Sequence, residues 1–320
     1  MNRLKKFFRR LSARLKQAVD HLKARFEPVY ERYLAKPPVN LIVRIVNQIG
    51  NTNATALAGN VAYNVILSLF PLLLGLLAIL GYFLPSETLQ SQIIQFFQTI
   101  MPSSVDVLQT NFTRIINARA TLGFLGTLGM LWTGTSIVST LDDAVNRAWG
   151  VTIFRPFWIA KPLELGLAIG IGLLMSISLG ASFLLSFESR FSLPFTGFFI
   201  QIVGYILAFL LILVTLLVMY KLFPNKKTTW RGVLPGALLG AVLFEIARQL
   251  FFFYAGSLAQ YEIIYGTLAT IIFFIIWIYY VAFIIILGAI FSSELQRLRQ
   301  ELHDGKYTVI NPGQQTPPGQ

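Results

Sequence analysis

The sequence contains no cysteine and only two histidines, His21 and His303. The lack of cysteine excludes disulfide bonds and thiolate chemistry. One histidine near each end cannot build a histidine-rich metal site. The sequence also has no P-loop, no GxSxG motif and no HExxH motif. We therefore expect no enzyme activity, no bound metal and no cofactor.

Charged residues are also scarce, at 12% of the 320 residues, whereas about 25% is usual for soluble domains. Hydrophobic residues make up 55%, and the mean hydropathy is +0.65. This composition predicts an all-α polytopic membrane protein. Acidic residues number 14 against 26 lysines and arginines. In a membrane protein such a basic excess indicates loops beside anionic lipid on the cytoplasmic leaflet, so we expect no nucleic-acid partner.

Six segments are long and apolar enough to cross a hydrocarbon core of about 30 Å. We predict transmembrane helices over residues 57–84, 121–141, 163–187, 199–223, 233–255 and 263–291. With these spans, 22 of the 26 lysines and arginines fall on one side and three on the other, and Arg248 lies inside the membrane. Basic loops stay in the cytoplasm, which predicts a plasma (inner) membrane protein with both termini cytoplasmic.

Residues 1–38 are predicted to form a basic amphipathic helix, with apolar residues spaced three and four apart. A helix of this kind beside a membrane is typical of one that lies on an anionic leaflet, although a short coiled coil is the alternative. Its predicted membrane-surface residues are Arg3, Lys5, Lys6, Arg9, Arg10, Arg14 and Lys16.

A membrane domain over residues 39–295 and a polar tail without fixed structure over 296–320 complete the predicted organisation. The membrane domain begins with a second amphipathic stretch that has Leu41, Ile42, Ile45, Val46 and Ile49 on one side. Two short amphipathic helices are expected within residues 85–120, at the outer surface.

The first predicted span carries polar groups and a proline in an apolar setting: Asn60, Tyr63, Asn64, Ser68 and Pro71. Proline inside a helix removes one hydrogen bond and usually causes a kink. Polar side chains in lipid are costly, so these should face other helices or water. Two interpretations stay open, a kinked span packed into a bundle and a helix that lines a substrate pathway.

Small and hydroxyl-bearing residues fill the second span, which we therefore expect to be an interior helix. The fourth span is almost wholly aliphatic and aromatic and is expected to face lipid. In the fifth span, Gly232, Gly236 and Gly240 repeat every four residues, a pattern typical of close helix packing in membranes.

Glu245 and Arg248 are the main candidates for function, because they lie near mid-membrane. At three residues apart they share a helix face and can pair. Ionisable groups at this depth often mark substrate or proton pathways, and Arg248 could hold a carboxylate or a phosphate. A buried structural ion pair is the alternative. Because Gly236, Gly240 and Arg248 are spaced by multiples of four, we expect Arg248 to point toward the bundle.

Several segments resemble the YihY/BrkB family of membrane proteins, in order along residues 40–295. They are Ala62–Leu72, Leu128–Trp132, Asp143–Trp149, Phe223–Asn225, Trp230, Pro235–Ala237, Tyr265–Leu268 and Gly288–Ala289. The resemblance implies six spans and a plasma-membrane location. One departure is Ile290, which stands where the family often has glutamate; Glu294 matches a second acidic position.

The family has also carried a ribonuclease label and a link to virulence, but a metal-dependent nuclease needs clustered histidine and aspartate ligands that this sequence lacks. We favour a transporter or exporter of an anionic substrate. A non-transporting membrane scaffold or envelope-integrity protein is the alternative, and an intramembrane enzyme comes third. The sequence leaves open whether copies of the chain form a homo-oligomer.

Overall fold

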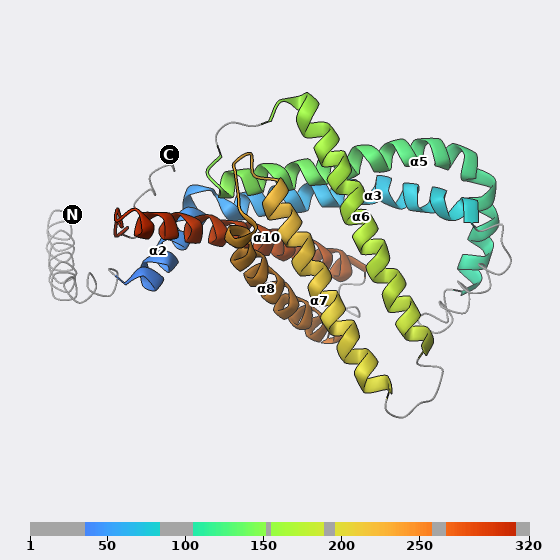
Figure 1. Ribbon diagram of the computed structural model, residues 1–320. Helices are drawn as coiled ribbons and strands as arrows, with labels where there is room; N and C mark the ends of the chain where they lie inside the picture. The colour runs from blue at the N-terminus through green and yellow to red at the C-terminus, as the bar shows by residue number, and fades with distance from the viewer. Residues whose placement is uncertain (1–35, 84–104, 152–154, 189–195, 258–266, 312–320) are drawn as a thin grey trace, which may run out of the picture. The chain divides into compact units, whose positions relative to one another are not determined.

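The computed structural model describes residues 36–83, 105–151, 155–188, 196–257 and 267–311 (Figure 1). Within these ranges the chain forms helices and no strand, which confirms the all-α prediction. The helices are α2 (Pro37–Asn51), α3 (Ala54–Phe83), α5 (Val105–Ala148), α6 (Phe157–Glu188), α7 (Thr196–Leu222), α8 (Trp230–Ser257) and α10 (Thr267–His303). The predicted basic N-terminal helix, with its seven membrane-surface residues, lies outside the described residues.

Three of these helices contain stretches long and apolar enough to cross a membrane: Ile202–Leu222, Trp230–Phe251 and Ile272–His303. Residues Ala54–Leu69 form a shorter apolar helix. Only the described residues enter this comparison, so the count of six spans stays a prediction. On α7, aromatic and aliphatic side chains such as Tyr205 and Ile206 are more than half exposed. The expectation that the fourth span faces lipid stays a prediction.

Helices α3 and α5 run side by side, as Figure 1 shows. Their backbones approach closely because small residues stand at the contact. A Cβ atom added at Gly75 would lie 2.7 Å from the Cβ atom of Met130 and 2.9 Å from the carbonyl oxygen of Gly126. A Cβ atom at Gly129 would lie 3.3 Å from that of Pro71. Pro71 stands inside α3, which continues past it to Phe83.

Two expectations about α5 are wrong. Residues 105–120 do not form a separate short helix, because α5 is one helix of 44 residues with no proline between Val105 and Ala148. Nor is its predicted span enclosed on all sides. Gly126 and Thr133 are buried, but Phe124 is 69% and Trp132 79% exposed. Among the described residues, α5 is therefore buried on one face only.

The chain divides into two compact units, Thr52–Ser292 and a smaller one made of Met1–Asn51 with Ser293–Gln320. The described part of the smaller unit is α2, the end of α10 and the segment that follows. Residues 296–303, which we expected to belong to an unstructured tail, are helical. Residues 304–311 are also described and are hydrogen-bonded to α2, so the prediction of a tail without fixed structure is wrong for residues 296–311.

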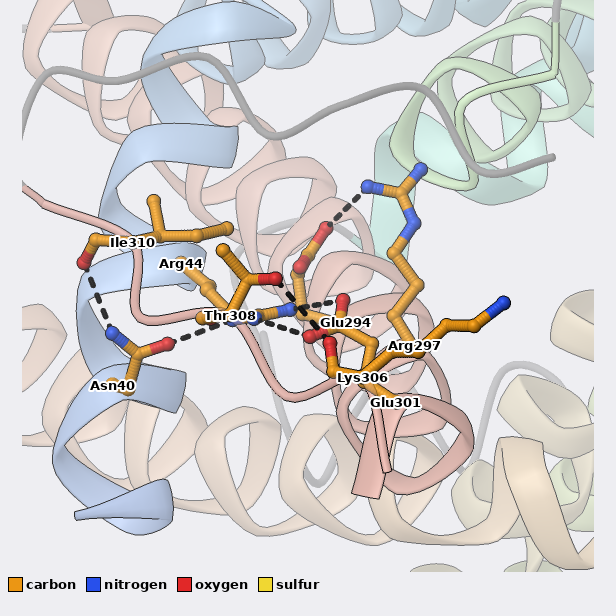
Figure 2. A network of polar contacts seen from close by, with 8 residues as sticks. All are labelled: Asn40, Arg44, Glu294, Arg297, Glu301, Lys306, Thr308 and Ile310. Carbon is orange, nitrogen blue, oxygen red and sulfur yellow. Dashed lines mark hydrogen bonds and ion pairs between the residues drawn. The ribbon is translucent and has the colours of Figure 1, made fainter. Parts of the chain in front are cut away.

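Arg44 of α2 holds the smaller unit together, as Figure 2 shows. Its side chain is 1% exposed and donates to Glu301 through two bonds, Nη1 to Oε1 at 2.8 Å and Nη2 to Oε2 at 2.6 Å. Arg44 also donates to the Asn40 side chain at 2.8 Å and to the carbonyl oxygen of Thr308 at 2.6 Å. Asn40 in turn donates to the carbonyl oxygen of Ile310 at 3.0 Å. These bonds fix the C-terminal segment against the polar side of α2.

Candidate functional site

The candidate site lies among α7, α8 and α10, where glycines allow very close contact. A Cβ atom at Gly236 of α8 would collide with the carbonyl oxygen of Gly288 and with Ser292 of α10. The Ser292 hydroxyl accepts a hydrogen bond from the Gly236 amide and donates to the carbonyl oxygen of Val233, both at 3.1 Å. On α7, the Tyr220 hydroxyl donates to the carbonyl oxygen of Ile285 at 2.6 Å. The predicted close-packing stripe is therefore confirmed at Gly236.

A cavity of about 250 Å³ opens next to this contact. Helix α8 contributes Gly240, Phe244 and Arg248, which are four residues apart and so share one face. Five further lining residues come from the stretch of α7 between Ala208 and Leu216, and Ile284 and Ile285 come from α10. Apart from Arg248 and Thr215 the lining is apolar or glycine, and the Thr215 hydroxyl donates to a carbonyl oxygen of its own helix at 2.8 Å.

Among the described residues that line the cavity, Arg248 is thus the only charged one. Its Nη2 donates to Glu245 Oε1 at 2.5 Å, which confirms the predicted pair. The guanidinium carbon lies 5.8 Å from the centre of the Tyr205 ring, within the range of a cation–π interaction. The Nε atom is buried and makes no hydrogen bond within the described part of the chain. A cation in an apolar pocket with donor capacity left over is suited to receiving an anion.

Glu245 does not line the cavity, although it is only one turn away on α8. Its carboxylate accepts the Arg248 bond and a second bond from Gln249 Nε2 at 3.1 Å. The side chains of Glu245 and Arg248 are 29% and 24% exposed. Glu245 therefore neutralises Arg248 from outside the cavity, and a ligand inside would compete with it for the guanidinium.

The polar residues predicted on the first span lie on α3 and not on this cavity. Asn64 donates to the carbonyl oxygen of Asn60 at 3.0 Å and accepts a long bond from Ser136 of α5 at 3.5 Å. Tyr63 is 60% exposed, whereas Ser68 is buried. The structure thus brings Glu245 and Arg248 together but does not bring these α3 residues, or Pro71, to the cavity. Their role in a pathway stays a prediction.

A second polar cluster, which sequence reasoning missed, joins the end of α5 to the turn between α7 and α8. Asn146 is 2% exposed; it donates to the carbonyl oxygen of Phe223 at 3.1 Å and accepts from the Asn225 amide at 2.8 Å. Arg155 donates to the carbonyl oxygen of Leu222 at 2.9 Å. Two of the segments that carry the family resemblance, 77 residues apart in sequence, therefore meet through one asparagine.

Asp142 belongs to the same cluster and lies one residue beyond the predicted second span. Burial raises its pKa from 3.8 to about 6, and the charges of Glu164 and Asp143 act in the same direction. The Arg155 guanidinium, 3.9 Å away, opposes this rise. Three acidic residues act on one another here, yet the described residues hold no group of three or more side chains able to ligate a metal.

Comparison with known proteins shows the family of the chain. The family model for virulence factor BrkB matches residues 45–308. The chain belongs to this family. Its relatives include a UPF0761 membrane protein of Pseudoalteromonas atlantica, 27% identical over 86% of this chain and 92% of that protein. Another, from Pseudoalteromonas translucida, is 29% identical over 77% and 83%. A third, from Chlorobium phaeobacteroides, is 30% identical over 77% of this chain and 57% of its own length. No solved structure matches the chain.

The structure also describes Ile290 and Glu294, the two positions at which the sequence was compared with the resembling family. Ile290 is fully buried in α10, as is Glu294 one turn further on. Glu294 accepts a hydrogen bond from Arg297 at 3.2 Å. A buried isoleucine needs no hydrogen-bond partner, whereas the buried carboxylate of Glu294 does.

Proposed function

We propose that this membrane protein of the BrkB family is a transporter or exporter of an anionic amphiphile, and that Arg248 contacts the anionic group. One observation carries the proposal: among the described residues, the only charged side chain of the cavity lining is an arginine, in walls that are otherwise almost entirely apolar. An acyl chain suits such walls, and guanidinium matches carboxylate and phosphate geometry. Charge near the middle of a bilayer costs about 2.5–3.5 kcal/mol on insertion scales, so an arginine kept there needs a role that offsets this.

The exchange of partners at Arg248 supplies a mechanism. In the unloaded protein Glu245 neutralises the guanidinium across 2.5 Å. An entering anion takes over the guanidinium from the cavity side and weakens its bond to Glu245. Release restores the ion pair, so the cavity never holds an uncompensated charge for long.

A leaflet-exchange assay tests the proposal with a fluorescent lysophosphatidate as the probe. Purified full-length protein is placed in vesicles that carry the probe in the inner leaflet, and an impermeant reductant destroys only what reaches the outer leaflet. We expect the protein to increase the reduced fraction and R248Q to abolish the increase. R147Q, an exposed arginine outside the cavity, is the matched control. Equal transfer of the lysophosphatidate probe to the outer leaflet with and without protein contradicts the proposal.

A non-transporting scaffold or envelope-integrity protein is the second candidate. It is favoured by the α3 polar residues, which bond within α3 and to α5 and do not extend the cavity into a longer polar path. We propose that the protein is not an enzyme, because its sequence shows no nucleophile beside a base. Anionic lipids of the cytoplasmic leaflet are its proposed partners.

We propose that the protein lies in the plasma membrane and that both of its termini are in the cytoplasm. This orientation rests on the distribution of lysine and arginine along the sequence. Reporter fusions test it at Gly50, Thr110, Phe154, Asn225 and Asn311. We expect an external signal at Thr110 only, and an external signal at Asn225 or Asn311 would overturn the orientation.

A further inference from the structure

Helix α2 is amphipathic, but its polar side is buried and its apolar side is exposed. Its buried side chains are Asn40, Arg44, Asn47 and Gln48, all polar. On the opposite side Ile42 is 62% and Val46 60% exposed. An ordinary surface helix of a soluble protein buries the apolar side and shows the polar one. The apolar side of α2 therefore calls for an apolar environment outside the described part of the chain.

The orientation of α2 is set by specific bonds and not by chance packing. Arg44 is tied to Glu301 and to the carbonyl oxygen of Thr308, and Asn47 donates to the carbonyl oxygen of Asn311 at 2.9 Å. Rotating α2 about its axis to bury the apolar side would expose these polar groups to water and break the buried Arg44–Glu301 pair. The polar side is therefore held inward, and the apolar side must face outward.

The outward side also carries no charge. Arg44 is the only charged residue of α2, and it is buried. Positions 38, 42 and 46, each four residues after the last, are Pro38, Ile42 and Val46, and all three are exposed. A surface built to receive a protein usually adds polar groups around its apolar centre, and α2 has none at these positions.

We propose that the apolar side of α2 lies in the membrane interface, with Ile42 and Val46 among lipid acyl chains. The helix has 15 residues, too few for the roughly 20 needed to cross a bilayer, so it lies along the surface. Only Thr52 and Asn53 separate it from α3, the apolar helix that follows. The positive φ of Asn53, 49°, makes this link a tight turn. A helix that ends two residues before an apolar membrane helix stays close to the bilayer surface.

If α2 lies in the membrane interface, the Arg44 network also holds the C-terminal segment at the membrane. The C-terminal segment covers the polar side of α2, so the helix meets lipid on one side and ordered protein on the other. The bonds from Arg44 and Asn40 then tie residues 308–310 to the membrane surface through α2. Without the segment, the polar side of α2 would be free to turn toward the lipid headgroups.

The absence of cysteine from the chain makes a direct test clean. I42C and V46C are introduced separately into the full-length protein and labelled with a fluorophore, and the protein is reconstituted in phosphatidylcholine vesicles. D304C, whose side chain is 60% exposed in the same unit, is the control. One set of vesicles contains lipid with a nitroxide quencher on its acyl chain, and another receives aqueous iodide.

We expect the acyl-chain nitroxide to quench the labels at positions 42 and 46 and iodide to leave them bright, with the reverse pattern at position 304. Quenching by iodide at 42 and 46 would show a water-exposed face and overturn the proposal. Labels insensitive to both quenchers would show a face covered by protein, either by other residues of the chain or by a second copy, and would overturn it as well. Normal thermal unfolding of each labelled protein confirms that the substitution has left the fold intact.

Discussion

Arg44 and Arg248 sit on helices of the same chain, and each pairs with a glutamate, yet their surroundings differ. Arg44 is 1% exposed and all three of its guanidinium nitrogens donate hydrogen bonds, to Asn40, Glu301 and the Thr308 carbonyl. Arg248 is 24% exposed, its bonded partner Glu245 is one turn away, and its Nε has no partner among the described residues. Each guanidinium nitrogen of Arg44 is bonded, whereas the Nε atom of Arg248 remains available to a ligand.

This difference in bonding indicates that Arg44 stabilises the fold and that Arg248 is available for function. A saturated, buried arginine has nothing to offer a ligand, and its value lies in joining segments 257 residues apart. An arginine on a cavity wall that is paired only locally contributes little to the fold, because a pair three residues apart closes no long loop. We therefore expect substitutions at Arg44 to act on stability and substitutions at Arg248 to act on function.

The largest effect is expected from R44M. It removes five donor groups and leaves Glu301, Asn40 and a carbonyl oxygen without their partner. Breaking a buried pair costs about 3–5 kcal/mol, and we expect about 3 kcal/mol here because Glu301 is 27% exposed. Thermal unfolding of purified protein measures the loss. R147M, at an exposed arginine paired with Asp143 within one helix, is a control for loss of a charge. Unchanged stability of R44M would remove the contrast between the two arginines.

The next effect is expected from G236A, which tests whether the cavity depends on the close contact beside it. The new methyl group would meet the backbone of Gly288, which cannot give way, so α8 and α10 must separate. Overpacking of this kind costs about 1–3 kcal/mol. G240A is the matched control, because its methyl group meets the Leu216 Cδ1 atom at 3.0 Å, at the end of a flexible side chain. We expect G240A to lose much less stability, and equal losses would contradict the packing argument.

What the sequence could predict about these sites depended on distance along the chain. Glu245, Arg248 and the glycines of α8 lie three or four residues apart, and helix geometry alone puts them on one face. The Arg44–Glu301 pair has no such signal, since nothing in α2 indicates which residue 257 positions away will meet it. The contact of Asn146 with Phe223 is hidden for the same reason.

Element boundaries followed a similar rule. The expectation of a separate short helix at 105–120 is wrong, because a change from polar to apolar composition does not by itself end a helix. The chain between Val105 and Ala148 contains no proline, and the helix continues through. The sequence predicted an amphipathic stretch where α2 forms, but periodicity alone does not say which side is buried. Only the contacts of Arg44 and Asn40 decide that the polar side faces inward.

A smaller effect is expected at Asp142, a third acidic residue beside an arginine. Its pKa is raised from 3.8 to about 6, mainly by burial, so the folded protein favours the neutral acid. The stability linked to this group is fully present below about pH 3.8 and is lost as the pH rises through about 6. We expect unfolding curves of wild type and D142N, measured across that window, to diverge as the pH rises, with the wild type losing more. Parallel curves would show that folding does not raise the pKa of Asp142.

The smallest effect on stability, together with a complete effect on function, is expected for the double variant E245Q/R248M. Removing both charges strands neither, and replacing a pair by less polar groups of similar size is often neutral, so we expect the unfolding free energy to change by less than about 1 kcal/mol. Each single variant should be less stable than the double, because it leaves one charge uncompensated in the predicted fifth span. Membrane abundance and thermal unfolding of the three variants measure this.

The same double variant decides between the two roles of the pair. If Arg248 contacts an anionic substrate, the variant reaches the membrane at normal levels and fails both in the lysophosphatidate assay and in restoring a deletion strain. D143N/R147M removes an exposed pair four residues apart on α5, outside the cavity, and serves as the matched control that keeps both activities. A stable E245Q/R248M protein that fully restores the deletion strain would end the transport proposal. Arg248 would then join Arg44 as part of the architecture, and the scaffold would become the better description of the protein.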